Sequence, residues 1–338
     1  MPKLQSNHYD VIIVGGGPAG LACADQLRSS SLSCLIIEKH QSFGQKVCAG
    51  GLTYLADSLN LPQDKICIFK HNYYFLNHKY HDIKLAHSIK TIDRPELSSI
   101  QYHRIQSAPN VQVLFNSTVL KVEGNCVLTQ NNKFSYQYLI GADGAGSIVR
   151  KHLGLKTQGR MGIYAMVRNA SSRLIWHLDY KKLYSGYLWE FPHQTHTNVG
   201  VLFSPEQLNA SRAEVILKEY IHDKNYEIIN GQFMRGFMNC YYQGNLFGDI
   251  FLVGEAAGLV SKLTGEGISF AIISGTEIAK KIIDKNYDLH GLQQALKYKK
   301  RQDFFWAISN YLPLFRPLTY PLFVALMKKT WFQRFYGL

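Results

Sequence analysis

The sequence contains no closely spaced pair of cysteines. Its six cysteines are scattered through 338 residues, without a Cys-x-x-Cys unit or another metal-type spacing. Zinc sites and the disulfide frameworks of small secreted domains both depend on such spacings. We therefore predict a reduced, cytoplasmic protein with neither a metal site nor disulfide bonds.

Long apolar runs are also missing. Two uncharged runs near the C-terminus, FFWAISNYLPLF and PLTYPLFVALM, have 12 and 11 residues, whereas a helix that crosses a bilayer needs about 20 apolar residues. Pro313, Pro317 and Pro321 are predicted to break any continuous helix there. The opening residues, MPKLQSNHYD, lack the layout of a signal peptide, so no export is expected.

Negative charge is scarce compared with positive charge. The chain has 37 Lys and Arg against 24 Asp and Glu, and residues 280–338 alone hold eleven Lys and Arg against three Asp, which gives 11 − 3 = +8. No recognised nucleic-acid-binding motif accompanies this cluster, so nucleic acid is not an expected partner. Two interpretations remain open: an interfacial contact with the inner face of a membrane, or buried helices with a solvated basic face.

A nucleotide-binding pattern opens the chain. The stretch YDVIIVGGGPAGLACADQLRSSSLSCLIIEK predicts a strand over residues 9–14, a turn, a helix over 19–29 and a strand over 34–37. Gly15 permits the tight turn, Gly17 lets the backbone approach a pyrophosphate, and Gly20 lets helix and strand pack closely. Glu38 follows the second strand, where a carboxylate can accept hydrogen bonds from a ribose. This unit alone fits FAD and NAD equally well.

Two later segments favour a flavin. YLIGADGAGSIVRK (138–151) predicts a strand that runs into a glycine-rich turn, and residues 248–282 predict a strand, a second glycine-rich loop and a helix. A nicotinamide site needs neither segment. A flavin needs both, because its ribityl chain must be held between the pyrophosphate and the ring.

In this order the motifs resemble FAD-dependent oxidoreductases of the para-hydroxybenzoate hydroxylase type and, within them, the geranylgeranyl reductase family, over residues 8–285. The resemblance implies that Glu255, where most relatives have Asp, bonds the ribityl hydroxyls. It also implies that the TGEGI amides (265–268) face the flavin N1–C2=O edge, where a helix N-terminus stabilises the anionic reduced ring. Arg94 in TIDRPEL would lie near the flavin unless it is a surface residue, and Val119 in STVLKV would bracket the adenine. The expected cofactor contacts are Gly15, Gly17, Ala19, Gly20, Glu38, Lys39, Lys46, Arg94, Val119, Asp143, Gly144, Gly254, Glu255, Gly265, Gly267 and Ile268.

Two further features resemble the reductase branch. KVCAGGL (46–52) is similar to the family signature Lys-x-Cys-Gly-Gly-Gly-Leu, with Ala49 in place of the first glycine. The resemblance implies that Cys48 faces the cavity and that substrate and flavin approach the backbone of Gly50 and Gly51; a plain turn is the alternative. GYLWEFPH (186–193) is similar to the family motif Tyr-x-Trp-x-Phe-Pro, and the strand period places Tyr187, Trp189 and Phe191 on one face. That face lines either the substrate cavity or the core.

The resemblance implies an enzyme that reduces isolated prenyl double bonds by hydride and proton delivery from reduced FAD. An unpolarised alkene has to be held over the ring in an apolar, water-excluding tunnel. Cys48, as the candidate catalytic residue, and a water held near Lys46 are the two candidate proton donors. Two alternatives remain: a flavin-dependent monooxygenase or halogenase on the same framework, and a flavin-binding protein without turnover.

No second GxGxxG unit occurs, so the electrons would come from transiently bound NAD(P)H, a ferredoxin-type carrier or a reduced quinone. The predicted fold is α/β. A Rossmann-type FAD-binding domain (1–66, 91–160 and 240–290) is interleaved with a mostly antiparallel substrate domain (67–90 and 161–239), and a helical segment (291–338) closes the substrate side. The sequence leaves the oligomeric state open.

Overall fold

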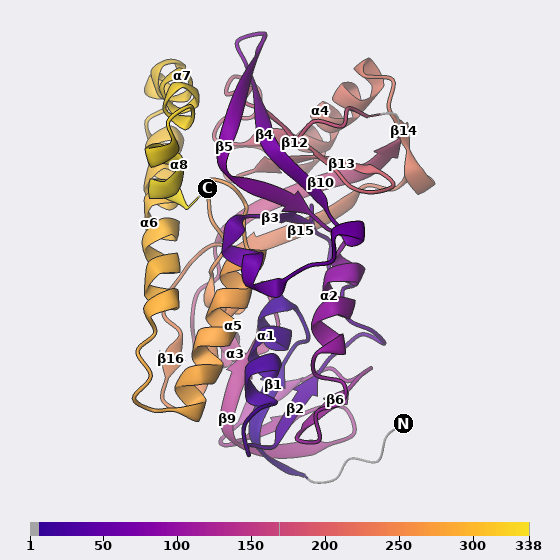
Figure 1. Ribbon diagram of the computed structural model, residues 1–338, viewed down its shortest axis with the longest axis vertical. Coiled ribbons are helices and arrows are strands. Elements are labelled where there is room, and N and C mark those ends of the chain that lie inside the picture. Colours follow the sequence, from indigo (N-terminus) through magenta and orange to yellow (C-terminus); the bar gives the residue numbers. More distant parts are fainter. Residues whose placement is uncertain (1–6, 169, 338) are drawn as a thin grey trace.

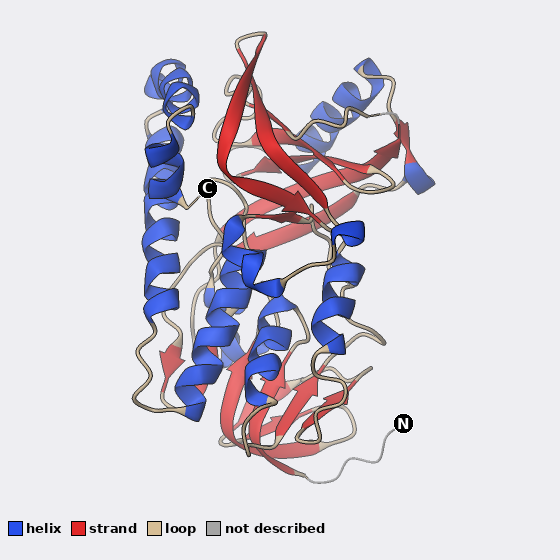
Figure 2. Cartoon of the chain, in the orientation of Figure 1, coloured by secondary structure: helices blue, strands red, loops and turns tan. Residues whose placement is uncertain are grey.

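The computed structural model describes residues 7–168 and 170–337. Residues 1–6 lie outside the described residues. Two predictions cover them: the first segment of the FAD-binding domain, and the expectation that the opening residues are not a signal peptide. Two β-sheets lie at opposite ends of the molecule, with helices between them and a column of helices along one side (Figures 1 and 2). The arrangement confirms the predicted α/β class.

The first sheet is built around the strand that begins the nucleotide-binding pattern. β1 lies between β2 and β9 and is parallel to both. Its residues from Val11 to Val14 are all buried, as expected for a central strand covered on both faces. The sheet has the order β16-β17-β9-β1-β2-β6, with β8 paired to β9 and β7 to β8. Its strands are β1 (His8–Val14), β2 (Cys34–Ile37), β6 (Val111–Leu114), β7 (Lys121–Glu123), β8 (Cys126–Leu128), β9 (Lys133–Gly141), β16 (Leu246–Phe247) and β17 (Ile250–Leu252).

The glycine turn between β1 and the first helix depends on the absence of side chains. Gly15 has φ +98°, and a Cβ there would lie 2.6 Å from the Ala142 carbonyl oxygen. A Cβ on Gly20 would lie 2.1 Å from the Gly15 carbonyl oxygen. Helix α1 covers Pro18–Leu27, so it starts one residue before and ends two residues before the predicted helix. Its early start follows from Pro18, whose fixed φ suits a first helical turn.

The second sheet is mostly antiparallel, apart from the parallel pair β4 and β11. Its order is β14-β10-β13-β12-β11-β4-β5-β3, with β15 paired to β10. β12 and β13 are buried at every position. The strands are β3 (Gly51–Leu52), β4 (Cys67–Leu76), β5 (Lys79–Thr91), β10 (Gly159–Arg168), β11 (Ile175–His177), β12 (Tyr187–Pro192), β13 (Thr197–Phe203), β14 (Glu227–Ile228) and β15 (Met234–Asn239).

Helices α1, α2 and α5 lie between the sheets, whereas α6, α7 and α8 run along one side (Figure 1). α1 and α5 cross closely, since a Cβ on Gly275 would lie 2.2 Å from the Ala19 carbonyl oxygen. Within the part of the chain that the structure describes, no helix has the length and hydropathy to cross a bilayer. Besides α1, the helices are α2 (Arg94–His103), α3 (Ile148–His152), α4 (Ala210–Asp223), α5 (Ile268–Ile283), α6 (His290–Tyr311), α7 (Arg316–Met327) and α8 (Thr330–Tyr336).

Two local predictions differ from the structure. Pro313 and Pro317 mark helix starts, but Pro321 lies inside α7, so the prediction of a break there is wrong. Burial of Tyr320, Val324 and their neighbours on the inner side of α7 outweighs one lost backbone bond. The strand predicted over STVLKV forms only from Lys121 onward, as β7. The domain boundaries predicted from the sequence stay a prediction.

Candidate active site

A cavity of about 820 Å³ is lined by residues from both sheets and from the helices between them. It brings together the three glycine motifs, the KVCAGGL stretch and the aromatic strand β12. Gly20 and Gly254 are the predicted site residues that do not line it; both lie in close backbone packing instead. The predicted residues in its lining are Gly15, Gly17, Ala19, Glu38, Lys39, Lys46, Cys48, Gly50, Gly51, Arg94, Val119, Asp143, Gly144, Tyr187, Trp189, Phe191, Glu255, Gly265, Gly267 and Ile268.

One end of the cavity is formed by the N-terminus of α1. Gly17 is the N-cap residue, has no capping side chain, and an added Cβ there would come no nearer than 4.0 Å to other atoms. Free N–H groups at a helix start are suited to bind phosphate. The carboxylate of Glu38 accepts hydrogen bonds from the N–H groups of Gly16 (2.8 Å) and His40 (3.0 Å). It therefore braces the glycine turn, and its contact with a ribose stays a prediction.

Arg94 shows that this end is built for a ligand. The residue is 7% exposed, and its Nε and Nη1 atoms have no hydrogen-bond partner among the described residues. Burial lowers the pKa of its guanidinium group. A buried cation without an anion is unfavourable, so the open donors and the glycine cradle fit a phosphate-bearing, ring-containing cofactor.

The second and third glycine motifs meet beside this end. Lys46 forms an ion pair with Glu255, whose other carboxylate oxygen accepts a hydrogen bond from the Asn239 N–H group (3.1 Å). Asp143 accepts a hydrogen bond from the N–H of Ile148 at the start of α3 (2.7 Å), while its Oδ1 has no partner among the described residues. Burial raises the pKa of Asp143. Because Lys46 is already paired with Glu255, it is less suited to hold a proton-donating water.

The KVCAGGL stretch is held against the second sheet. Gly50 has φ +76°, and a Cβ there would lie 2.3 Å from the Ile92 carbonyl oxygen and 2.6 Å from the His193 ring. A Cβ on Gly51 would lie 3.0 Å from the Phe191 ring. The Ala49 carbonyl oxygen lies 3.0 Å from His193 Nε2. Protein packing therefore accounts for glycine at both positions, whether or not a ligand also approaches them.

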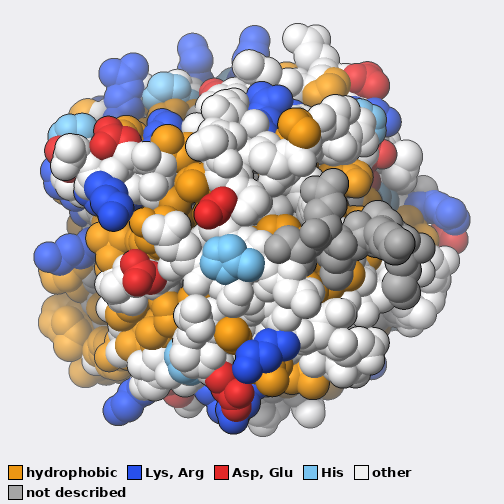
Figure 3. Space-filling view, turned by 90° about the horizontal axis from the view of Figure 1, so that it is seen from below, with side chains coloured by type: hydrophobic (Ala, Val, Ile, Leu, Met, Phe, Trp, Pro, Cys, Tyr) orange, Lys and Arg blue, Asp and Glu red, His pale blue; other side chains and the backbone are white. Residues whose placement is uncertain are grey.

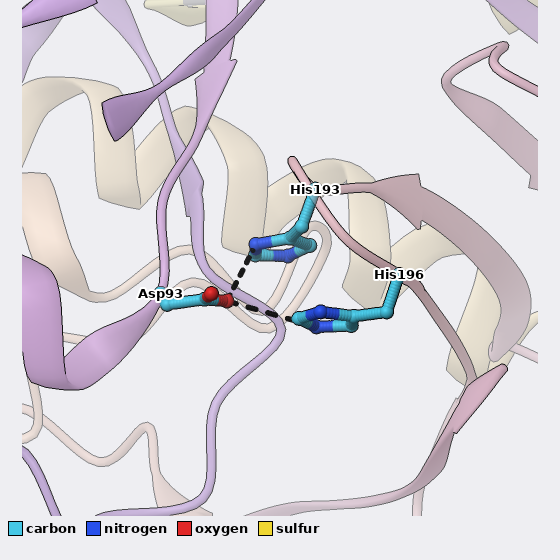
Figure 4. Close-up of side chains that lie close together, drawn as sticks. All are labelled: Asp93, His193 and His196. Atoms are coloured by element: carbon cyan, nitrogen blue, oxygen red, sulfur yellow. Dashed lines mark ion pairs between the residues drawn. The ribbon is translucent and has the colours of Figure 1, made fainter. Parts of the chain in front are cut away.

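Behind this stretch the structure brings together Asp93, His193 and His196, a group that the sequence analysis missed (Figure 4). His193 Nδ1 lies 2.9 Å and His196 Nε2 lies 3.6 Å from Asp93 Oδ1. The imidazole rings are stacked, with 7° between their planes. A shared metal requires in-plane lone pairs that converge, which stacked parallel rings do not provide. The arrangement is a hydrogen-bonded ion pair, and the hydrogen bond from His193 lowers the pKa of Asp93.

The other end of the cavity is aromatic. The rings of Tyr187 and Trp189 lie 6.2 Å apart and those of Trp189 and Phe191 lie 6.1 Å apart, on one face of β12 as the alternation predicts. The lining residues that the sequence analysis missed, because no local motif marks them and they come from distant elements, include Tyr74 on β4, Trp176 on β11, and Phe323 and Met327 on α7.

Glu266 lies where the two ends meet. It was predicted only as a backbone amide of the TGEGI turn, but its side chain is buried and lines the cavity. One carboxyl oxygen accepts a hydrogen bond from Thr53 Oγ1 (2.5 Å), and the other has no partner among the described residues. Burial raises the pKa of Glu266 to about 7. A Glu between the glycines of a cavity-lining turn was the available signal.

The C-terminal helices present apolar side chains outward. Leu314 is 89% exposed, and Leu318 and Leu322 continue the same side of α7 at helical spacing. Seen from the end that holds the first sheet, hydrophobic side chains gather on the side of these helices, among Lys and Arg (Figure 3). We call this the C-terminal apolar face. Its exposed members are Phe304, Tyr311, Leu312, Leu314, Phe315, Leu318, Leu322, Trp331 and Phe335.

Comparison with known proteins agrees with a flavin site. Two sequence profiles, each described as an FAD binding domain, match residues 10–76 and 96–229. The chloroplastic geranylgeranyl diphosphate reductase of Arabidopsis thaliana is 25% identical, across 94% of this chain and 74% of the relative. A digeranylgeranylglycerophospholipid reductase of Methanococcoides burtonii is 26% identical, across 83% of this chain and 77% of the relative.

Solved structures share the fold. A geranylgeranyl bacteriochlorophyll reductase-like protein from Thermoplasma acidophilum superposes with a TM-score of 0.79 at 21% identity, across 95% of this chain and 92% of that one. A flavin-dependent brominase superposes with a TM-score of 0.75 at 18% identity, across 98% and 93% of the two chains. The fold is therefore common to reductases and halogenases.

Proposed function

We propose that this chain, which belongs to the geranylgeranyl reductase family of FAD-dependent oxidoreductases, reduces carbon–carbon double bonds of a prenyl lipid. FAD is the cofactor that its FAD binding domains indicate. The observation that carries the proposal is the continuity of the cavity, which runs from the glycine turns to an aromatic chamber. That chamber suits a hydrocarbon chain.

Each end of the cavity would have a separate task. The N-terminus of α1 would bind the pyrophosphate, Glu38 the adenosine ribose, and the amides that begin α5 the anionic edge of the reduced ring. Arg94 offers its unpaired donors at the same end. Bound FAD, once reduced, supplies the hydride. NAD(P)H and a ferredoxin-type carrier both remain candidate electron donors, and anaerobic reduction with each one separates them.

The aromatic residues would position the alkene and exclude water. Tyr187, Trp189 and Phe191 form one wall, and Phe323 and Met327 of α7 form another. An unpolarised double bond offers no charge for the protein to bind, so its reactivity depends on placement in a dry site. Gly51 lies next to Phe191 and keeps the backbone close to this chamber, while Gly50 lies next to His193.

A photoreduction experiment tests the proposal. The FAD-loaded protein is photoreduced without oxygen, and a geranylgeranyl lipid is added while flavin absorbance is followed. We expect lipid-dependent reoxidation and a product heavier by two hydrogen atoms per reduced double bond. Product formation only with oxygen would favour a monooxygenase or halogenase, which the shared fold with the brominase keeps as the alternative. No lipid-dependent reoxidation would favour a flavin-binding protein without turnover.

We also propose that the C-terminal apolar face contacts the surface of an anionic membrane, with the protein peripheral at the inner face. Exposed Leu314, Leu318 and Leu322 would enter the interface, while Lys328 and Lys329 would lie near lipid phosphates. The inner side of the same helix lines the cavity, so a lipid would reach the chamber past α7.

Vesicle sedimentation tests the membrane contact. We expect binding to vesicles of phosphatidylglycerol and phosphatidylcholine that weakens with salt, and that falls about tenfold for Lys328→Gln with Lys329→Gln. The matched control exchanges two basic residues away from this face, Lys121 and Lys133, both in the first sheet. Equal binding of both double variants, or equal binding to pure phosphatidylcholine vesicles, would contradict the contact.

A further inference from the structure

We propose that Glu266 donates the proton that accompanies hydride transfer to the alkene, an assignment that rests on the proposed function. Three observations carry it: its position in the cavity, its hydrogen bonds and its lack of a counter-charge. Sequence comparison with the family suggested only Cys48 or a water near Lys46 as donors. The structure offers a carboxyl group instead.

Position is the first observation. Glu266 lines the cavity between Gly265 and Gly267, immediately before helix α5 begins at Ile268. A Cβ on Gly265 would lie 3.4 Å from the side chain of Leu202 and 3.7 Å from the hydroxyl of Tyr187, so the turn that carries Glu266 touches the aromatic wall. A proton released here has a short path to a chain held in the aromatic chamber.

Burial and an incomplete set of hydrogen bonds favour a neutral carboxyl group. Glu266 Oε1 accepts from Thr53 Oγ1 (2.5 Å), which lies 3.1 Å from Ser269 Oγ. Glu266 Oε2 is buried without a partner among the described residues. A buried carboxylate with one bare oxygen is unfavourable, whereas a protonated carboxyl group loses far less on burial.

No opposite charge is paired with Glu266 among the described residues. Burial raises its pKa and outweighs the hydrogen bonds of Thr53 and Ser269, which lower it. Tyr54, the first residue of the 3-10 helix Tyr54–Leu59, is a titratable side chain that interacts with its charge. The start of α5 contributes a partial positive charge that opposes protonation. An acid that titrates near the working pH is suited to general acid catalysis.

The proposed step balances as follows. The π bond of the alkene breaks, one carbon receives a hydride from reduced FAD, and the other carbon receives the carboxyl proton of Glu266. The lipid gains two electrons and two hydrogen nuclei, the cofactor is oxidised by two electrons, and Glu266 becomes a carboxylate. A proton from water returns to the carboxylate before the next turnover.

Cys48 and Lys46 are less suited to this role. Lys46 is engaged with Glu255, and the Cys48 sulfur accepts a hydrogen bond from the Gly50 N–H group (3.4 Å). Both therefore have structural partners in the KVCAGGL stretch. Glu266 is a buried acid of the cavity with an unpaired oxygen, and the residue before it, Gly265, lies next to Leu202 and Tyr187 of the aromatic end.

The test compares Glu266→Gln, Glu266→Asp and the matched control Glu277→Gln. Glu277, in α5, is also a buried glutamate, but its carboxylate accepts hydrogen bonds from the N–H groups of Gly291 and Leu292, and it does not line the cavity. We expect Glu266→Gln to bind FAD normally and to slow lipid-dependent reoxidation at least 100-fold. Glu266→Asp should restore part of the rate with a shifted pH profile, and Glu277→Gln should keep both rate and profile.

Infrared spectroscopy supplies a readout independent of turnover. A protonated carboxyl band that titrates near pH 7 is expected in the wild type and in Glu277→Gln but not in Glu266→Gln. If the band is missing from the wild type, or if Glu266→Gln is active within about threefold with an unchanged pH profile, the assignment is wrong while the proposed reduction stands. An FAD-loaded wild type without lipid-dependent reoxidation would overturn the proposed function and this assignment together.

Discussion

The two ends of the cavity are assembled differently. The glycine end comes from short segments in which strand, turn and helix follow one another in the chain, as β1, the turn from Gly15 and α1 do. The aromatic end draws Tyr74 from β4, Trp189 from β12 and Phe323 from α7, which are far apart in sequence. A binding surface made from one local unit leaves a pattern in the sequence, whereas one made by distant elements does not.

The ends also differ in polarity. The glycine end contains polar atoms of Arg94 and Asp143 that have no partner among the described residues and could bind a polar ligand. The aromatic end has few polar groups, of which the Trp189 indole N–H is unpaired among the described residues. Substitutions at one end should therefore affect cofactor binding and leave the lipid untouched, and the converse should hold at the other end.

The largest effect is expected for Gly15→Val, which tests whether the glycine end binds the cofactor. The φ of +98° disfavours valine, and its Cβ would lie within 2.9 Å of three backbone atoms of Ala142 and Asp143. We expect loss of FAD binding and a free energy of unfolding lower by about 4 kcal/mol or more. Gly154→Val is the control, because Gly154 also has a positive φ (+68°), its Cβ would meet nothing within 4 Å, and it does not line the cavity. Normal FAD binding by Gly15→Val would contradict the assignment of cofactor binding to the glycine end.

The second largest effect is expected for Glu266, where the two ends meet, and it concerns how the free energy of unfolding depends on pH. Its folded pKa of about 7 lies above the unfolded value of about 4.3. Its contribution to stability is therefore fully present below pH 4.3 and is lost as pH rises through 7, a loss of about 3 kcal/mol. Urea unfolding at pH 5.5 and 8.5 should show a larger decrease for the wild type than for Glu266→Gln. An equal decrease would contradict the raised pKa.

Trp189→Ala tests whether the aromatic end binds the lipid and not the cofactor. Removal of the indole from the wall should weaken lipid binding about tenfold, roughly 1.4 kcal/mol, and should leave the FAD dissociation constant unchanged. Flavin fluorescence titration and reoxidation at varied lipid concentration measure the two quantities. If Trp189→Ala loses its flavin, β12 is a core strand and the division into two ends is wrong.

The smallest effect is expected for Asp93→Asn, behind the KVCAGGL stretch. The hydrogen bond from His193 lowers the pKa of Asp93, so the contribution of Asp93 is present above its unfolded pKa and is lost as pH falls. Because the side chain is 40% exposed, we expect less than about 1 kcal/mol. Its pH dependence has the opposite sign to that of Glu266, and urea unfolding between pH 3 and 6 measures it. If Asp93→Asn does not change the free energy of unfolding between pH 3 and 6, the interaction of Asp93 with His193 is contradicted.

Prediction from sequence succeeded where chemistry is local. The GxGxxG unit, the strand Cys34–Ile37 and the alternation in YLWEFP were found because backbone geometry and period two act over a few residues. The side chain of Glu266, the Asp93–His193–His196 group and the α7 wall were missed, since only tertiary packing creates them. Pro321 shows the same limit, because packing kept a helix that the proline rule would have ended.

The proline within α7 has a mechanical consequence. Pro321 cannot donate a hydrogen bond to the carbonyl of Pro317, so the helix is weakened midway along its length. At this point α7 alone forms the chamber wall, because its residues Phe323 and Met327 line the cavity while Leu322 is exposed on the outer side. Under the proposed function, a wall that can bend at this proline would let the chamber admit hydrocarbon chains of several lengths.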